Sequence, residues 1–331
     1  MKIAFIFSYP HIVPSDGVYS QAMTWKRGLE SLKNEVVLIN MWENYNWKSF
    51  DAIVFFGFNE YMRDIINWIY PINPKIAVAP ILDPNYSLWM LKCYARWGCS
   101  KLRLTNAYHS LHTVRDKVKI FLVRSDFEKH FLSKGFNISP YKCKKIPLSY
   151  SIPQNETNNE KREPFCLHIS LLCDNRKNVK RLIEASIKYN FKLILCGLLR
   201  NDTERKLLDS WMQGNPNISY LGYVTKENMI ELYSKARVFA LPSIYEGVGI
   251  VALDAAVSGC DIVITELGGP KEYYSGKAIE VDPYNIDEMG RGIKSFLDGK
   301  THQPQLAIDI KKKYDPYALS VLLNKTLYDL Q

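Results

Sequence analysis

Short runs of apolar residues alternate with segments of helical periodicity along the whole chain. In the first half these runs lie at residues 2–7, 35–40, 51–56, 75–80 and 119–125, and a short last strand is expected at the more polar segment 142–148. In the second half they lie at residues 165–172, 191–197, 218–224, 238–243, 261–266 and 278–282. Continuous apolar runs are typical of strands that are buried on both faces, so the alternation predicts an α/β protein with parallel sheets between layers of helices.

One polar segment divides this pattern. Residues 151–164, SIPQNETNNEKREP, show no periodicity, and we interpret them as a linker. A chain of 331 residues commonly forms two domains, so we expect one Rossmann-like, doubly wound domain over 1–150 and another over 165–315. We expect the last helix, 316–331, to pack back on the first domain. In such folds ligands bind at the carboxyl ends of the strands, here in the cleft between the domains.

The charge is concentrated in the first half of the chain. The net charge is +9, and residues 1–160 hold 20 Lys and Arg against 13 Asp and Glu. No acidic residue occurs over 84–115, a stretch that also contains Trp89 and Trp97. We consider two interpretations: a solvated basic helix whose aromatic residues belong to the core, or a surface for anionic lipid or an acidic acceptor. Nucleic acid is not expected as a partner, because no recognition motif accompanies the charge.

Several classes of function are disfavoured. The seven cysteines form no C-x-x-C pair, and no Asp-x-Asp or His cluster occurs, so we expect neither a metal site nor a cofactor. The glycine fingerprint of nicotinamide enzymes is absent after both first strands. The N-terminal apolar run is too short for a signal peptide, and no run is long enough to span a membrane. We therefore expect a cytoplasmic protein, with peripheral contact to the cytoplasmic membrane face as a further expectation.

The candidate chemistry is concentrated in residues 244–260, IYEGVGIVALDAAVSGC. Glu246 lies in a loop with two glycines, Gly247 and Gly249, and the following helix carries Asp254. The free amides at the start of a helix form a phosphate site, and glycines let a ligand approach the backbone. Ionised carboxylates accept hydrogen bonds from hydroxyl groups. Two carboxylates around a phosphate site suit a nucleotide sugar, which carries hydroxyls on both sides of its diphosphate.

Here the chain resembles a known family. The segment LPSIYEGVGIVALDAAVSGCDIVITELGGPKEY resembles the donor-site signature of retaining glycosyltransferases of family 4, which have the GT-B fold. Flanking segments such as RKNVKRLIEA and VKIFLVRSDFEKHFLSKG resemble the same family, and the likeness covers about residues 119–290. The resemblance implies transfer of a sugar from a nucleotide diphosphate to a hydroxyl acceptor, with retention and without a metal. A cell-surface polysaccharide or a glycolipid would suit the basic, tryptophan-rich surface as acceptor.

The resemblance also implies roles for individual residues. Glu246 would hold hydroxyls of the donor sugar, and Asp254 would hold the ribose diol. The amides of Gly249 and Ile250 would contact phosphate, while Lys177 would neutralise the diphosphate. The other donor-site residues that it implies are Gly17, Arg176, Tyr223, Val224, Gly247, Gly268 and Gly269.

The sequence departs from the family pattern at three points. Asp254 replaces the usual Glu, and Leu171 replaces an Arg. Where the family usually has a His-Asp pair, this chain has Leu82 and Asp83. Asp83 therefore remains a catalytic candidate on the acceptor side, and the residue that takes the role of the histidine stays open. The histidines considered for that role are His11, His109 and His112.

These departures keep two alternatives open. One is a degenerate, non-catalytic relative that binds a sugar or a partner. The other is an epimerase of similar architecture, acting on a free nucleotide sugar.

Overall fold

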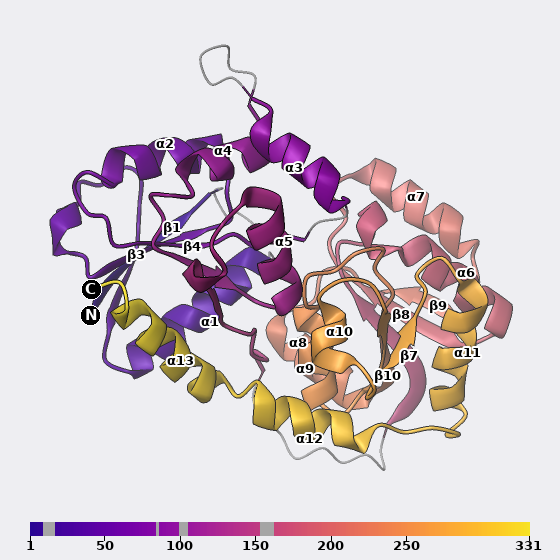
Figure 1. The fold of residues 1–331 in the computed structure, drawn as a ribbon. Helices are drawn as coiled ribbons and strands as arrows, with labels where there is room; N and C mark the ends of the chain where they lie inside the picture. The colour runs from indigo at the N-terminus through magenta and orange to yellow at the C-terminus, as the bar shows by residue number, and fades with distance from the viewer. Residues whose placement is uncertain (9–16, 84–85, 99–104, 153–161) are drawn as a thin grey trace. The chain divides into compact units, whose positions relative to one another are not determined.

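The structure is a computed structural model that describes residues 1–8, 17–83, 86–98, 105–152 and 162–331. Its contacts divide the chain into two units, Met1–Ser149 with Pro316–Gln331, and Tyr150–Asp315. Each unit has one parallel six-stranded sheet with helices on both faces (Figure 1). The expected fold class is therefore confirmed. Among the described residues, no helix is both long and apolar enough to cross a membrane.

The first unit has the strand order β2-β1-β3-β4-β5-β6. Its elements are β1 (Lys2–Phe7), α1 (Gly17–Ser31), β2 (Glu35–Leu38), η1 (Trp47–Ser49), β3 (Ala52–Phe56), α2 (Glu60–Ile69), β4 (Ile76–Ala79), α3 (Leu88–Arg96), α4 (Ala107–Val114), β5 (Ile120–Val123), α5 (Asp126–Phe136), η3 (Pro140–Lys142), β6 (Cys143–Lys145) and α13 (Pro316–Tyr328).

Side chains of this sheet alternate between two cores. On β1, Ala4 and Ile6 pack with the α2–α5 layer, whereas Ile3 and Phe5 pack with α1 and α13. Helix α13 runs beside α1, and Gly28 permits the close approach, because a Cβ there would lie 1.9 Å from the Ser320 hydroxyl oxygen.

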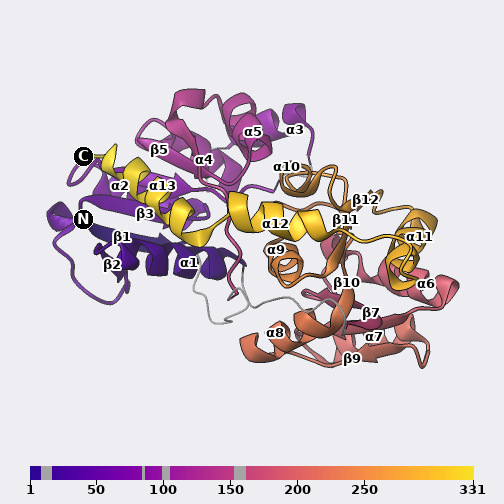
Figure 2. The ribbon, with the colours of Figure 1, turned by 90° about the horizontal axis from the view of Figure 1, so that it is seen from below.

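The second unit has the strand order β12-β11-β10-β7-β8-β9. Its elements are β7 (Glu163–Ile169), η5 (Asn175–Lys177), α6 (Val179–Tyr189), β8 (Lys192–Cys196), α7 (Asp202–Met212), β9 (Ile218–Tyr220), α8 (Lys226–Lys235), β10 (Ala236–Leu241), α9 (Ile250–Val257), β11 (Asp261–Thr265), α10 (Pro270–Tyr274), β12 (Ile279–Val281), α11 (Ile286–Leu297) and α12 (Pro304–Lys313). Helices α6 and α11 lie on one side of this sheet and α9 on the other (Figure 2). The first strand, β7, lies between β10 and β8, so the order of strands reverses between β7 and β10.

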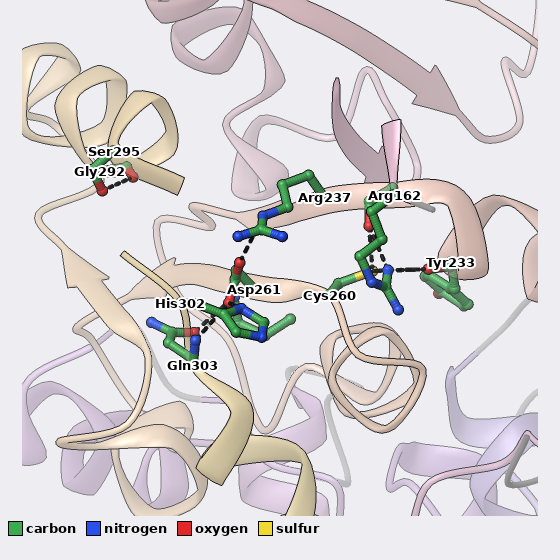
Figure 3. A network of polar contacts seen from close by, with 11 residues as sticks. Arg162, Tyr233, Arg237, Cys260, Asp261, Gly292, Ser295, His302 and Gln303 are labelled. Atoms are coloured by element: carbon green, nitrogen blue, oxygen red, sulfur yellow. Dashed lines mark hydrogen bonds and ion pairs between the residues drawn. The ribbon is translucent and has the colours of Figure 1, made fainter. Parts of the chain in front are cut away.

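Helix α12 is an element that the sequence pattern did not predict. Its buried residues Leu306 and Ile310 are four positions apart, and α12 packs against α9. A polar network holds the segment before α12 to the amino end of β11 (Figure 3). Asp261 accepts hydrogen bonds from His302 Nδ1 and from the Gln303 amide, both at 2.8 Å. Arg237 completes the network, with its Nε 3.3 Å from the same carboxylate.

We expect Asp261→Ala to lower the free energy of unfolding by ~2 kcal/mol, because two donors and a nearby arginine lose their buried acceptor. Chemical denaturation of the full chain measures this. As a control, Asp209→Ala removes only the half-exposed carboxylate that pairs with Arg205 on α7, and should change stability by less than ~0.5 kcal/mol. Equal effects of the two substitutions would contradict a special role for Asp261.

Candidate active site

Two loops meet at the carboxyl ends of β7 and β10, where the order of strands reverses. The Ile244 amide donates to the Arg176 carbonyl at 2.8 Å, which joins the β10–α9 loop to η5. The Asn178 side chain donates to the carbonyls of Pro242, at 2.9 Å, and Pro283, at 2.6 Å. Ligands of doubly wound folds bind at this position in the sheet, so Arg176, Lys177 and Glu246 lie where the fold favours a site.

A buried ion pair lies between these loops. Lys177 Nζ donates to Glu246 Oε2 at 2.6 Å, and the two side chains are only 13% and 10% exposed. The Ser243 hydroxyl donates to the same oxygen at 3.1 Å. Burial alone would raise the pKa of Glu246, but the charges of Lys177 and Arg176 and these hydrogen bonds outweigh it and lower the pKa. Glu246 is therefore a carboxylate at neutral pH, beside two cations.

The glycines of this region have specific backbone roles. Gly249 has φ 79° and precedes the first residue of α9, Ile250, where backbone amides have no partner within the helix. A Cβ on Gly269 would lie 1.7 Å from the Gly247 carbonyl oxygen, and one on Gly268 would lie 2.7 Å from that of Glu246. Gly268 and Gly269 thus let their loop lie directly on the backbone that carries Glu246.

Asp254 has partners different from those of Glu246. Its carboxylate is buried, and it accepts hydrogen bonds from the Ser151 amide and hydroxyl at 2.6 and 2.8 Å. Burial raises the pKa of Asp254 to about 6, and the bonds from Ser151 oppose that rise. The two acids of the motif thus have separate partners: Glu246 lies mainly beside cations, whereas Asp254 accepts mainly from the neutral donors of Ser151.

The remaining candidates in this unit follow β9 and β7. Tyr223, in the loop before α8, is 52% exposed, and Val224 beside it is partly buried. The guanidinium of Arg176 lies 5.7 Å from the centre of the Tyr245 ring. Leu171 follows β7 in the loop before η5.

In the first unit, Asp83 lies in an ion cluster. Arg124 Nη2 is 2.6 Å from Asp83 Oδ1, and Arg124 Nε is 3.0 Å from Glu128 Oε2. Glu128 also accepts from the Leu82 amide at 2.6 Å, so this cluster fixes the backbone before Asp83. Gly17 is the first residue of α1 and has open space where a side chain would begin.

The histidine candidates differ in what the structure shows of them. Residue 11 lies outside the described residues. The Nδ1 atoms of His109 and His112 each bond to a backbone carbonyl at 3.1 Å, of Ala95 and Phe136 respectively. Burial lowers the pKa of His112. Both rings therefore have a structural hydrogen bond within the first unit.

One polar pair near the ion pair was not predicted from the sequence. His168, inside β7, is fully buried, and its Nδ1 donates to the Ala240 carbonyl at 2.7 Å. Burial lowers the pKa of His168 to about 4, so the ring is neutral at pH 7 and its Nε2 accepts from the Ser170 hydroxyl at 2.7 Å. A polar residue within the apolar run FCLHIS was the signal that could have identified it.

Comparison with known proteins gives a consistent assignment. The sequence profile of the family "Glycosyl transferases group 1" matches residues 153–313. The chain is similar to the O-antigen chain mannosyltransferase B of Escherichia coli, with 27% identity over 57% of this chain and 54% of that protein. The matched segment thus spans about half of that relative.

Solved structures agree at the level of the fold. Sucrose-phosphate synthase from Thermosynechococcus elongatus superposes with a TM-score of 0.74 at 15% identity, over 99% of this chain and 98% of the other. Anabaena HepE in complex with UDP and glucose also has a TM-score of 0.74, at 14% identity over 99% of both chains. Residues 153–313 thus match the glycosyl transferases group 1 family, and the fold of the chain is GT-B.

The ion pair predicts a dependence of stability on pH. Because the pKa of Glu246 is lowered by folding, its stabilisation is present above the unfolded value near 4.5 and is lost as the pH falls through the folded value. We expect Glu246→Gln to lower the free energy of unfolding by ~2 kcal/mol at pH 7, and the difference from the parent to shrink in acid.

Denaturation across a pH series measures this difference. The control Glu266→Gln changes an exposed carboxyl in the same unit and should have little effect at any pH. A difference for Glu246→Gln that does not change with pH would contradict the assignment.

Proposed function

We propose that this chain, as a glycosyl transferases group 1 member, transfers a sugar from a nucleotide diphosphate donor to a hydroxyl acceptor. The observation that supports this best is the Lys177–Glu246 pair, at 2.6 Å, between the loops that follow β7 and β10. It combines a buried carboxylate for sugar hydroxyls with a cation for a leaving diphosphate.

In this proposal the residues act as follows. Glu246 accepts hydrogen bonds from the donor sugar and places its anomeric carbon, while the amides of Gly249 and Ile250 meet phosphate at the start of α9. Lys177 and Arg176 neutralise the charge that develops on the diphosphate, so the reaction requires no metal. Retention of the anomeric configuration is part of the same proposal and follows from the family resemblance.

The sugar and the acceptor are proposed from the relatives. The similarity to a mannosyltransferase of O-antigen chains supports a hexosyl donor and an acceptor in cell-surface polysaccharide or glycolipid synthesis. The solved complex of HepE contains UDP, so we include both GDP and UDP donors in the test. Asp83, held by Arg124, is the acceptor-side residue that we propose.

We also propose that the first unit contacts an anionic membrane through α3 and the residue that caps its carboxyl end, Trp97. Trp89 and Trp97 are 72% and 76% exposed, so the interpretation that places these aromatic residues in the core is wrong for both. The partly exposed Lys92 and the exposed Arg96 lie on the same short helix segment, and Tyr94 is 41% exposed beside them. Aromatic rings and cations in a stretch without acidic residues, 84–115, suit an anionic lipid surface on the cytoplasmic side.

A non-catalytic relative is the alternative function. Leu171 in place of the family's arginine supports it, because one cation for the diphosphate is missing. The two functions differ in turnover: only a transferase slowly hydrolyses the donor that it binds.

The donor proposal is tested by thermal shift with UDP-, GDP-, dTDP- and ADP-sugars. We expect one nucleotide to raise the melting temperature selectively. Glu246→Gln should remove the extra affinity of the nucleotide sugar over the free nucleotide diphosphate. Lys177→Ala should weaken binding of the nucleoside diphosphate by ~tenfold or more, because it removes a cation from the diphosphate site. It should weaken binding of the monophosphate much less.

The control for the second variant is Lys180→Ala, on α6, where the side chain is 62% exposed and 3.9 Å from Glu184. No shift with any nucleotide sugar would contradict the donor site. A selective shift without hydrolysis or transfer would favour the non-catalytic alternative.

The membrane proposal is tested by co-sedimentation with vesicles of phosphatidylglycerol and phosphatidylcholine. We expect binding to the anionic vesicles only, and a loss of ~tenfold or more for Trp89→Ala combined with Trp97→Ala, because two large apolar side chains no longer enter the interface. Trp42→Ala is the control, since Trp42 is 95% exposed but lies outside α3. Equal losses for both variants would contradict the assignment to α3.

A further inference from the structure

The carboxylate of Asp254 is covered by a residue of its own unit. Asp254 is only 3% exposed, on a helix that is otherwise apolar. Its Oδ1 accepts from the Ser151 amide at 2.6 Å, and its Oδ2 accepts from the Ser151 hydroxyl at 2.8 Å. A ligand can reach these oxygens only if Ser151 leaves them.

Ser151 is held at a third point. Its carbonyl accepts from Lys226 Nζ at 2.8 Å, at the start of α8. The neighbours Tyr150 and Ile152 are 3% and 5% exposed. The amide, the hydroxyl and the carbonyl of Ser151 thus all have partners, so this contact is an organised part of the second unit.

The two donors of Ser151 have the connectivity of a vicinal diol. The amide nitrogen and the hydroxyl oxygen are borne on the adjacent carbons Cα and Cβ, as the two ribose hydroxyl oxygens are borne on adjacent ring carbons. Both groups therefore present two donors, separated by two carbons, to the two oxygens of one carboxylate. Lys226, which donates to the Ser151 carbonyl, lies two residues after Val224. The family resemblance places Tyr223 and Val224 beside the base of the nucleotide.

We propose that Ser151 is an internal surrogate for the ribose diol: it occupies the Asp254 carboxylate in the nucleotide-free chain, and a ribonucleotide must displace it to bind there. This inference rests on the proposed donor function and adds Ser151 and Lys226 to its nucleoside site. The surrogate keeps the buried acid hydrogen-bonded in the absence of ligand. The displacement lowers the apparent affinity, because only the fraction of molecules with a free carboxylate can accept the diol.

The raised pKa of Asp254, about 6, agrees with this geometry. The donors of Ser151, with smaller contributions from the Lys226 charge and the Ile152 amide, only partly offset burial of the charge. The side chain of Asp254 is one methylene shorter than the family's usual Glu, which also agrees with the proposal. At this length the carboxylate lies where the Ser151 amide donates to it at 2.6 Å.

Calorimetric binding to the full chain tests the proposal. The probes are GDP and UDP, each compared with the analogue that lacks both ribose hydroxyl groups. We expect the parent chain to bind the better ribonucleotide more tightly than its analogue. Ser151→Ala should strengthen binding of that ribonucleotide by roughly three- to tenfold, because one of the competing hydrogen bonds is lost, and should leave the analogue unchanged.

Two further variants support the comparison. Ser258→Ala is the matched control, because the Ser258 hydroxyl donates at 2.9 Å to the backbone carbonyl of Asp254, away from the carboxylate. Ser151→Cys keeps the bulk of the side chain with a weaker donor and should give a smaller gain, which guards against misfolding of the alanine variant.

Three results would overturn the proposal. Equal affinities of ribonucleotide and analogue for the parent chain would mean that Asp254 only anchors Ser151, while the donor function stands. A weaker ribonucleotide complex of Ser151→Ala would mean that Ser151 supports binding. No binding of either diphosphate would overturn the donor function as well.

Discussion

The second unit depends on the placement of one buried charge pair, Lys177 with Glu246. Burying either charge alone would be costly, so the two loops that carry them are held by several independent contacts. The Asn178 side chain bonds to two carbonyls, and the Gly268-Gly269 loop lies against the backbone of Glu246. These contacts use backbone groups and glycines. The charged side chains therefore stay at the carboxyl ends of the central strands β7 and β10, where a ligand can interact with them.

The motif divides its two acids between different environments. Glu246 has cations beside it and a lowered pKa, whereas the pKa of Asp254 is raised to about 6 by burial. A carboxylate beside a cation keeps its charge when a ligand arrives. A carboxylate held by neutral donors can exchange them for other neutral donors, such as hydroxyl groups. The first suits a site where charge develops, and the second suits recognition of a neutral part of a ligand.

The sequence predicted the sheets well because their strands are buried on both faces and appear as continuous apolar runs. It missed α12, whose buried positions Leu306 and Ile310 are few and lie among lysines. Lys177 and Glu246, which are 69 residues apart, were identified together through the family resemblance. The bond from Ser151 to Asp254 could not be predicted, since a serine in a polar segment has no signal for a partner 103 residues away. The role of Arg124 could not be predicted for the same reason. It pairs with Asp83 only because β4 and β5, which precede these two residues, are neighbours in the sheet.

Helix α13 has a consequence for how the chain acquires its structure. Leu323, Leu327 and Leu330 fill the same core as Ala22 and Leu29, so the first unit is assembled from both ends of the sequence. Residues 1–149 are synthesised before the second unit, yet this core stays open until α13, which follows the second unit, is made. The second unit is continuous and can close its core before then. The second unit can therefore complete its core before the first unit does, and the nascent first unit exposes apolar surface until α13 has been made.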